Sequence, residues 1–387
     1  MKFNEIITTA ALIVVFALSC SNPSGNTADK CLAKEYNDSG ELLPYPKSDL
    51  MSGFSIDTTR LSIGHGDNWP ITWADDDKQY SFFCDGLGFG TLKEHVSIAP
   101  VVIEGIPPHV TGKDILSASG TLSIEGGDVN SAKVCGLLMI EGTLYAWVRN
   151  INPPGMPKGT GSGLMLSHDH GKTWEWVDWI WPAIGYPTWL NAGKNYADAR
   201  DGYAYFISPD GPSAYFDYDS MLMGRVPVEA ILDKEKYSFF GGLDDNGEAR
   251  WGAYDGREAF FRYDGGCFRP DIVYNPGLKR YFVSIASPAP PAKSSSTFRT
   301  ASNDWAWWSA DHADRIAHLG IFEAPNPWGP WKTVFFEEDW GAPENRFSPH
   351  IPPKWISEDG RTFQILYSCI PVGPYRFNIQ KCTITVK

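Results

Sequence analysis

Basic residues, long apolar runs and closely paired cysteines are all scarce in this sequence of 387 residues. Its 33 Lys and Arg side chains are outnumbered by 46 Asp and Glu, which gives a net charge of −13. That balance disfavours a nucleic-acid partner, because proteins that bind nucleic acid need a basic surface. No stretch of about 20 apolar residues occurs, so no membrane-spanning helix is expected.

Motifs of cofactor and metal enzymes are missing as well. There is no phosphate-binding glycine loop, metal-ligand cluster or nucleophile elbow, so no cofactor and no catalytic metal is implied; a structural ion in a central channel stays open. None of the seven cysteines lies at C-x-x-C spacing, which disfavours a zinc ribbon or a redox site. We expect most of the cysteines to be small core residues.

The N-terminus has the pattern of an export signal. An apolar stretch ends in Ala-Leu-Ser-Cys, which resembles a bacterial lipobox, where cleavage leaves Cys20 as a lipidated first residue. An ordinary secretory signal is the alternative. We expect an exported, monomeric protein held by lipid at the outer membrane, the cell surface or in the periplasm. The predicted parts are a signal peptide over 1–19, a tether over 20–50 and one folded domain over 51–387.

Aromatic residues, glycine and proline are abundant, with 16 Trp, 17 Tyr, 38 Gly and 29 Pro. This composition favours β-structure with many turns. A pattern of short strand, tight acidic or glycine turn and aromatic-rich strand recurs five times, with first strands at 71, 136, 196, 271 and 354. Such a long period is typical of propeller blades of about four strands each.

We therefore predict an all-β fold, a single five-bladed β-propeller, with six or seven blades as the alternative. Only one strand follows the last hairpin, so blade five lacks its outer strand, and the alternating segment 54–63 is predicted to supply it and close the ring. The Asp box S-x-D-x-G-x-T-W at 167–174 predicts a turn between strands three and four of blade two. Its two histidines are predicted to be solvated turn residues rather than metal ligands.

The predicted hairpins place two carboxylates at one mouth of the propeller. In a hairpin, the entry of strand one and the exit of strand two lie at the same end, and Asp67 and Asp85 flank the first hairpin. Glycoside hydrolysis needs such a pair, because one carboxyl protonates the leaving oxygen while the other is the nucleophile or activates water. The alternative is that both bind backbone amides of glycine turns.

Other residues at the predicted rim are candidates for substrate binding. The basic ones bind sugar hydroxyls, neutralise a uronate beside a base such as Tyr196 or His350, or form salt bridges with rim aspartates. Three tryptophans, Trp69, Trp147 and Trp189, are either stacking platforms for sugars or core residues. The full set of predicted binding residues is Lys133, Arg149, Asn150, Tyr196, Asp198, Arg269, His350 and Lys354.

Two further segments are conspicuous. The proline- and tryptophan-rich stretch 323–331 falls between strands three and four of blade four, and we interpret it as a rigid structural turn. The insertion 288–315 leaves from the rim end, so it is predicted to be a lid or substrate clamp, with disorder as the alternative.

Six motifs together resemble a known bacterial family, DUF4185, some of whose members are endo-D-arabinanases on a propeller scaffold. The similarity spans about residues 60–386, and it implies that Asp67 and Asp85 match a catalytic aspartate pair on the first blade. Propeller polysaccharide lyases acting on ulvan and on rhamnose–glucuronate linkages share the general architecture. The motifs are GDNWPITWADD, GLLMIEGTLYAWVRN, NYADARDGYAY, YNPGLKRY, EAPNPWGPW and PPKWISEDGRT.

The sequence therefore leads to three hypotheses on function. The first is an extracellular glycoside hydrolase, similar to endo-D-arabinanases, that degrades a polysaccharide with a carboxylate pair. The second is a polysaccharide lyase acting on a uronate-containing polymer such as ulvan. The third is a glycan-binding lipoprotein without catalytic activity.

Overall fold

Strands make up nearly all regular structure in the residues that the computed structural model describes, which are 43–116, 131–288, 317–370 and 372–387. These residues belong to a single unit, Lys34–Lys387. Within them the helices are five short 3₁₀ turns, and none is long and apolar enough to cross a membrane. The predicted all-β class is confirmed.

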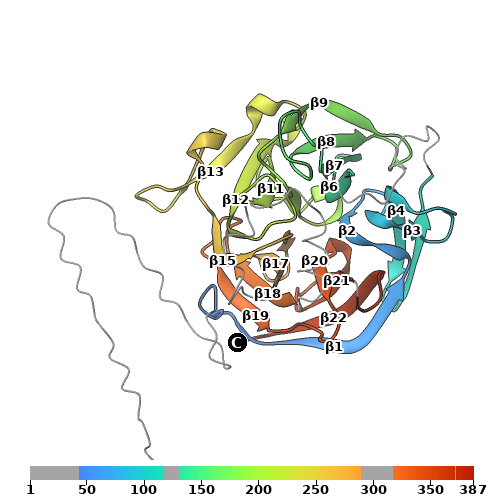
Figure 1. The fold of residues 1–387 in the computed structure, drawn as a ribbon. Coiled ribbons are helices and arrows are strands. Elements are labelled where there is room, and N and C mark those ends of the chain that lie inside the picture. The colour runs from blue at the N-terminus through green and yellow to red at the C-terminus, as the bar shows by residue number, and fades with distance from the viewer. Residues whose placement is uncertain (1–42, 117–130, 289–316, 371) are drawn as a thin grey trace, which may run out of the picture. The chain divides into compact units, whose positions relative to one another are not determined.

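The strands form antiparallel sheets that follow one another along the chain (Figure 1). The first sheet has the order β2 (His65–Trp73), β3 (Gln79–Gly88), β4 (Val96–Ile106), β5 (His109–Asp114). The second has the order β6 (Lys133–Ile140), β7 (Thr143–Arg149), β8 (Ser162–Ser167), β9 (Glu175–Trp181).

The next sheet is larger and falls into two halves, whose inner strands pair in parallel over two residue pairs. The first half contains β10 (Thr188–Asn191), β11 (Tyr203–Pro209), β12 (Tyr218–Pro227), β13 (Ser238–Leu243) and β14 (Ala249–Gly252), with β15 (Phe261–Cys267) also paired to β12. The second half contains β16 (Asp271–Asn275), β17 (Arg280–Pro288), β18 (Ala317–Ala324) and β19 (Lys332–Glu337).

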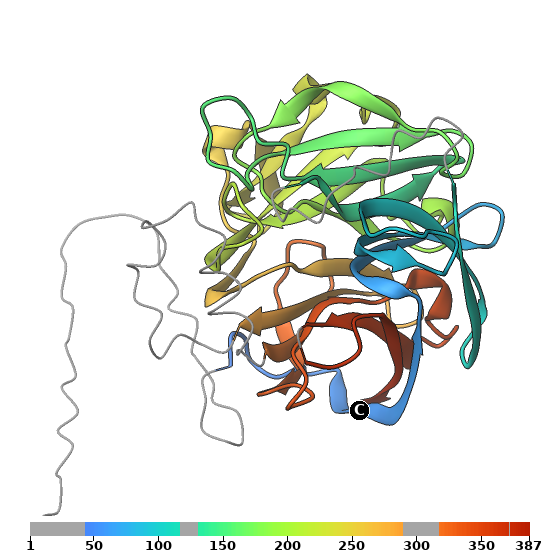
Figure 2. The ribbon, with the colours of Figure 1, turned by 45° about the vertical axis from the view of Figure 1, so that its right-hand side comes forward.

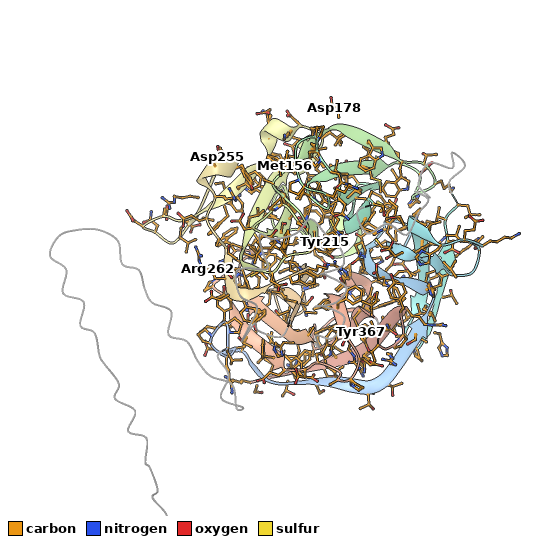
Figure 3. The ribbon with its side chains drawn as sticks, in the orientation of Figure 1. Met156, Asp178, Tyr215, Asp255, Arg262 and Tyr367 are labelled. Atoms are coloured by element: carbon orange, nitrogen blue, oxygen red, sulfur yellow. The ribbon has the colours of Figure 1, made fainter. Side chains whose placement is uncertain are left out.

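The innermost strands contact one another in a closed order: β2 with β6, β6 with β10, β10 with β16, β16 with β20 (Arg346–His350), and β20 with β2. Figures 1 and 2 show the sheets radiating from this ring. In Figure 3, Tyr215 lies near the middle of the view, whereas Asp178 and Asp255 lie at the periphery. This is a propeller arrangement, in which the inner strands surround a central channel.

Inner strands are buried over nearly their whole length because neighbouring sheets cover both of their faces. Every residue of β6 is buried. Gly136 permits its closest approach to β10, because a Cβ at this position would lie 2.8 Å from the Cα of Thr188. Five cysteines in the described residues are free and buried, which confirms their prediction as core residues: Cys84, Cys135, Cys267, Cys369 and Cys382.

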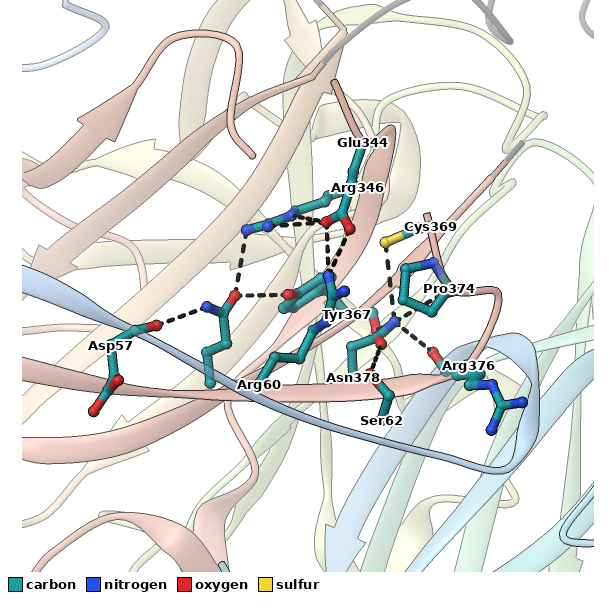
Figure 4. Close-up of polar contacts among 11 residues, drawn as sticks. Asp57, Arg60, Ser62, Glu344, Arg346, Tyr367, Cys369, Pro374, Arg376 and Asn378 are labelled. Atoms are coloured by element: carbon teal, nitrogen blue, oxygen red, sulfur yellow. Dashed lines mark hydrogen bonds and ion pairs between the residues drawn. The ribbon is translucent and has the colours of Figure 1, made fainter. Parts of the chain in front are cut away.

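The first strand closes the last sheet. β1 (Met51–Ile63) pairs antiparallel with β22 (Phe377–Val386) in the order β1-β22-β21-β20, where β21 is Thr362–Cys369. The predicted closure by 54–63 is confirmed. A polar network reinforces it: Arg60 on β1 donates to both carboxylate oxygens of Glu344, at 2.8 and 2.7 Å (Figure 4).

The turns behave partly as predicted. The Asp box lies between β8 and β9, where Asp169 accepts hydrogen bonds from Ser167 Oγ and from the amide and hydroxyl of Thr173. The stretch 323–331 runs from the end of β18 to β19, as expected for a structural turn. Of the insertion 288–315, only residue 288 is among the described residues.

Two predicted inner strands are wrong. Residues 194–196 and 353–355 form 3₁₀ turns, η1 (Lys194–Tyr196) and η5 (Pro353–Trp355), where the repeat pattern placed strands starting at 196 and 354. The inner strands lie earlier in the chain, as β10 and β20. Each turn links its inner strand to the second strand of the hairpin. Residues of these turns that were predicted to lie at the rim with Asp67 therefore lie at the opposite end of the channel.

The folded part also begins before Met51. Leu43, Tyr45 and Ser48 are buried, and Thr333 on β19 forms backbone hydrogen bonds with this segment at 2.8 Å. Residues 43–50 therefore belong to the packed domain rather than to the predicted tether. Residues 1–42, which include the predicted signal peptide and Cys20, lie outside the described part.

Candidate functional site

Two carboxylates, those of Asp67 and Asp85, lie at the same end of the β2–β3 hairpin. Asp67 pairs in register with Cys84, and Asp85 is the next residue of β3. Gly86 permits the strands to meet here, because a Cβ at this position would lie 2.2 Å from the carbonyl oxygen of His65. The two acids interact electrostatically, so the structure brings together the pair that the sequence pointed to.

Asp67 is enclosed, with 7% of its surface exposed. Burial and then the negative charge of Asp85 raise the pKa of Asp67 to about 7, against the opposing effects of Arg269, Tyr375 and Lys133. A carboxyl with this pKa keeps its proton over much of the neutral range. Asp67 is therefore suited to donate a proton.

Asp85 has a different environment from Asp67. Its side chain is 25% exposed and accepts a hydrogen bond from the Nζ of Lys133 at 2.6 Å. Lys133, the first residue of β6, is buried and also contacts the hydroxyls of Ser97 at 2.7 Å and Ser131 at 2.8 Å. These three acceptors match the three protons of the ammonium group, so the lysine charge is fixed beside Asp85.

Tyr375, in the loop before β22, completes the surroundings of Asp67. Its side chain interacts with that of Asp67 and lowers the pKa of that carboxyl. Burial, followed by the charge of Asp67, raises the pKa of the tyrosine, so its hydroxyl keeps its proton. Its backbone carbonyl accepts from the amide of Gly66. Sequence reasoning missed Tyr375, because it lies far along the chain from Asp67 and outside the hairpin pattern.

Two buried arginines lie beside the carboxylate pair. Arg149 ends β7 and Arg269 precedes β16, and their guanidinium carbons lie 5.1 and 5.6 Å from the ring centroid of Tyr215. The amide of Asn150 donates to the hydroxyl of Tyr215 at 2.8 Å. Arg269 also interacts electrostatically with Asp67. The predicted residues Arg149, Asn150 and Arg269 thus belong to one cluster with the two acids.

His350 also lies near this cluster. Its Nε2 lies 2.8 Å from the carbonyl oxygen of Asn68, and its Nδ1 lies 3.2 Å from the carboxylate of Asp271. Since both ring nitrogens face acceptors, His350 is held as a donor between two inner strands. This geometry does not suit a general base.

Three predicted binding residues, Tyr196, Asp198 and Lys354, are not at this site. The Nζ of Lys354 contacts Asp77 in the β2–β3 turn, at the opposite end of β2 from Asp67. Tyr196 is buried and donates to the carbonyl of Tyr203 at 2.9 Å. These three predictions were wrong because their segments are the 3₁₀ turns η1 and η5 or follow them directly, rather than the entries of inner strands.

Of the two alternatives left open for the three tryptophans, sugar platforms or core residues, the structure supports the second. Trp69, Trp147 and Trp189 are each 0% exposed. Trp147 and Trp189 pack on each other with ring centroids 5.2 Å apart, so neither presents a face to a sugar.

The backbone around the acids adopts an unusual conformation. Asn68, Asp85, Asn150, Arg269 and Ser348 all have positive φ, between 41° and 65°, although none is a glycine. Residues with side chains adopt this region rarely and at an energetic cost, and such positions gather at functional sites. Their concentration here supports a functional role for this end of the channel.

Among the described residues, one group has the spacing of metal ligands: Asp75, Asp76 and His170. Its two aspartates are exposed, and the Nε2 of His170 lies 2.7 Å from Asp75. The group lies at the turn end of β2, away from Asp67, and these contacts account for its arrangement without an ion.

Comparisons with known proteins find remote structural likeness only. No protein-family model and no curated protein matches the chain. A Bacteroides ovatus protein described as a presumed hydrolase is 13% identical, with a TM-score of 0.49, over 83% of this chain and 87% of its own. A GH43_1 enzyme of Xanthomonas citri is 12% identical, with a TM-score of 0.44, over 84% and 91%.

An α-L-arabinofuranosidase of Podospora anserina, solved with cellotriose, is 10% identical, with a TM-score of 0.42, over 84% of this chain and 92% of its own. The matched structures are thus described as hydrolases, two of them glycoside hydrolases by name. Likeness at these scores is too distant to support a statement on activity. The resemblance to the DUF4185 family stays a prediction.

Proposed function

We propose that this chain is a glycoside hydrolase that cleaves a polysaccharide, with Asp67 as the general acid and Asp85 as the second carboxylate. The observation behind the proposal is the contrast between two neighbouring acids. Burial raises the pKa of Asp67 to about 7, whereas Asp85 is more exposed and faces the ammonium group of Lys133. Glycoside hydrolysis requires such a protonated and ionised pair.

In the proposed reaction, the Asp67 carboxyl transfers its proton to the oxygen of the leaving sugar as the glycosidic bond breaks. The Asp85 carboxylate attacks the anomeric carbon or takes a proton from the attacking water. Lys133 holds Asp85 in place, and the side chain of Tyr375 interacts with that of Asp67. After hydrolysis both acids return to their starting protonation states.

The proposal extends to an endo-D-arabinanase-like specificity, a five-bladed propeller, and export with a lipid on Cys20. The cyclic order of the five inner strands supports the blade number, and the motif resemblance supports the specificity. The alternative as a lyase has no support from the site, because Tyr196 lies elsewhere and both ring nitrogens of His350 are occupied.

The test is the activity of Asp67→Asn and Asp85→Asn on a panel of polysaccharides that includes arabinan. We expect each substitution to lower turnover by about 10²- to 10⁴-fold, measured as new reducing ends. Asp75→Asn is the matched control, since Asp75 is an exposed carboxylate at the other end of the same hairpin.

Near-wild-type turnover in both Asn variants would contradict the proposal. Products that absorb in the ultraviolet as unsaturated uronates would indicate a lyase instead. Binding of a glycan by the wild-type protein without any product would leave a non-catalytic glycan-binding protein. Proton NMR of the first product anomer would show whether Asp85 acts as nucleophile or as base.

A further inference from the structure

We propose that the sugar bound beside the two carboxylates has an anionic substituent and that Arg149 binds it. This inference rests on the proposed function for the identity of the ligand as a glycan. It adds one feature to the glycan of the proposed function, a carboxylate or sulfate group on or beside the sugar at the cleavage site.

The first argument is a count of charges in the cluster. Three cations, Lys133, Arg149 and Arg269, are at most 3% exposed, and they lie with two carboxylates, Asp67 and Asp85. A third buried carboxylate nearby, that of Asp271, lies against His350. Lys133 pairs with Asp85, and Arg269 interacts with Asp67. That assignment leaves the charge of Arg149 without a carboxylate.

The contacts of Arg149 agree with this count. Its Nη1 donates to the amide oxygen of Asn150 at 3.3 Å, a long hydrogen bond to a neutral group. Its Nε is buried and has no acceptor. No ion pair of Arg149 is found in the described part of the chain. A buried guanidinium of this kind is costly unless an anion compensates it.

The second argument is the crowding of like charges. Arg149 and Arg269 lie around the same ring, that of Tyr215. Burial, and next the charge of Arg149, lower the pKa of Arg269. An oxyanion bound at Arg149 relieves this repulsion and supplies two oxygen acceptors, which a guanidinium can bind together.

The location favours a substituent on the glycan over a free anion. Arg269 links the two groups, since it interacts both with Asp67 and with Arg149. Because Arg149 and Arg269 also lie around the same ring of Tyr215, we place the anion in the same cluster as the proton donor Asp67. The chain as a whole has a net charge of −13, so selection of an acidic glycan depends on this local cluster.

The test compares the binding of methyl glucuronide, methyl glucoside and methyl glucoside 6-sulfate by isothermal titration calorimetry. We expect the wild-type protein to bind one of the two anionic glycosides at least about tenfold more tightly than the neutral one, as charge-assisted hydrogen bonds predict. Tighter binding of methyl glucuronide would identify the substituent as a carboxylate, and tighter binding of methyl glucoside 6-sulfate would identify it as a sulfate.

Arg149→Met is expected to lose this preference, Arg149→Lys to keep part of it, and the control Arg250→Met, at an exposed position, to keep all of it. Thermal unfolding shows whether each variant is folded. If Arg149→Met does not fold, the inference is tested by two results: the preference of the wild-type protein for an anionic glycoside, and the reduction of that preference in Arg149→Lys.

Equal affinity of the wild-type protein for the charged and neutral glycosides, or no binding of either anionic glycoside up to about 50 mM, would overturn the inference. So would an undiminished preference in folded Arg149→Met. Hydrolysis of a neutral glycan without charge preference overturns this inference alone. Charge-selective binding without hydrolysis overturns the proposed function alone.

Discussion

The protonation state of Asp67 depends on its burial and on the charges of its neighbours. Enclosure raises the pKa of this carboxyl, and the repulsion from Asp85 adds to the effect. The same carboxyl must therefore influence both the pH dependence of turnover and the pH dependence of folding. These two consequences are separable by experiment.

The first prediction concerns stability. The pKa of Asp67 is about 7 in the folded protein and about 3.9 in an unfolded chain, so the folded state binds more protons between these values. Stability relative to Asp67→Asn should therefore fall as pH rises from about 4 to 7. Urea unfolding of both proteins at several pH values measures this difference. A pH-independent difference would show that Asp67 ionises normally.

The second prediction concerns Tyr375, a positioning residue. The interaction of its side chain with Asp67 lowers the pKa of that carboxyl, so Tyr375→Phe should raise that pKa and move the alkaline limb of the kcat profile to higher pH. Turnover at the optimum should fall by about tenfold or less. If Tyr375 has only a structural role, its replacement would change the free energy of unfolding without shifting the alkaline limb of the kcat profile. Tyr254→Phe, on a tyrosine outside the site, is the control.

At the scale of elements, the Asp box is a self-contained turn. In a tight turn some backbone amides lack a backbone acceptor, and the side chain of the aspartate accepts the hydrogen bond from one of them. The Nε1 of Trp174 donates to the carbonyl of Gly171 at 2.9 Å. The turn lies between β8 and β9, the outer strands of their sheet, and away from the acids.

The third prediction follows from that separation. Asp169→Ala removes the acceptor for the amide and hydroxyl of Thr173, so we expect the free energy of unfolding to fall by about 1–2 kcal/mol. Turnover of the folded variant should equal that of the wild type, since the turn does not contact the site. Chemical denaturation and a rate assay at low temperature test both parts. A loss of turnover in the folded variant would contradict this assignment.

The hairpin repeat predicted three of the five inner strands and missed two for an identifiable reason. The repeat is defined from its acidic or glycine turn, and the nearest apolar residues before that turn were assigned to the inner strand. Before Tyr203 those residues are in η1, where Asn195 and Tyr196 have positive φ. Before Thr362 they follow Pro352 and Pro353, whose ring geometry favours a break in the strand.

The same limit applies to the site. Lys133 and Arg149 lie at strand ends and Asp67 and Asp85 lie near them, at positions that the local hairpin pattern locates, and the structure brings all four together. Tyr375 comes from a loop without repeat or motif. Its approach to Asp67 is a property of the closed ring, which no local signal contains.

At the scale of the whole molecule, the last sheet depends on both ends of the folded chain. Beyond the ladder between β1 and β22, Glu344 receives hydrogen bonds from Arg60 and Arg346 (Figure 4). Although burial acts in the opposite direction, these bonds hold the pKa of Glu344 below its usual value. Their stabilisation is therefore present at neutral pH and is lost as pH falls through that lowered pKa.

The fourth prediction tests this contribution. Glu344→Gln leaves Arg60 and Arg346 without their carboxylate, so we expect a loss of about 1–3 kcal/mol in the free energy of unfolding at pH 7. The control is Glu258→Gln, whose ion pair with Arg250 is exposed, and whose loss should cost under about 1 kcal/mol. Equal effects in the two variants would show that the network does not stabilise the closure.

The pairing of β1 with β22 also imposes an order on biosynthesis. Of the strands in the described residues, β1 is synthesised first and β22 last, so β1 exists without its partner while all the others are made. Pairs so distant in sequence form late, because a long loop must close first. The pairing of β1 with β22 is thus a late step of folding, and until it forms β1 is an exposed edge that another unfolded chain can capture.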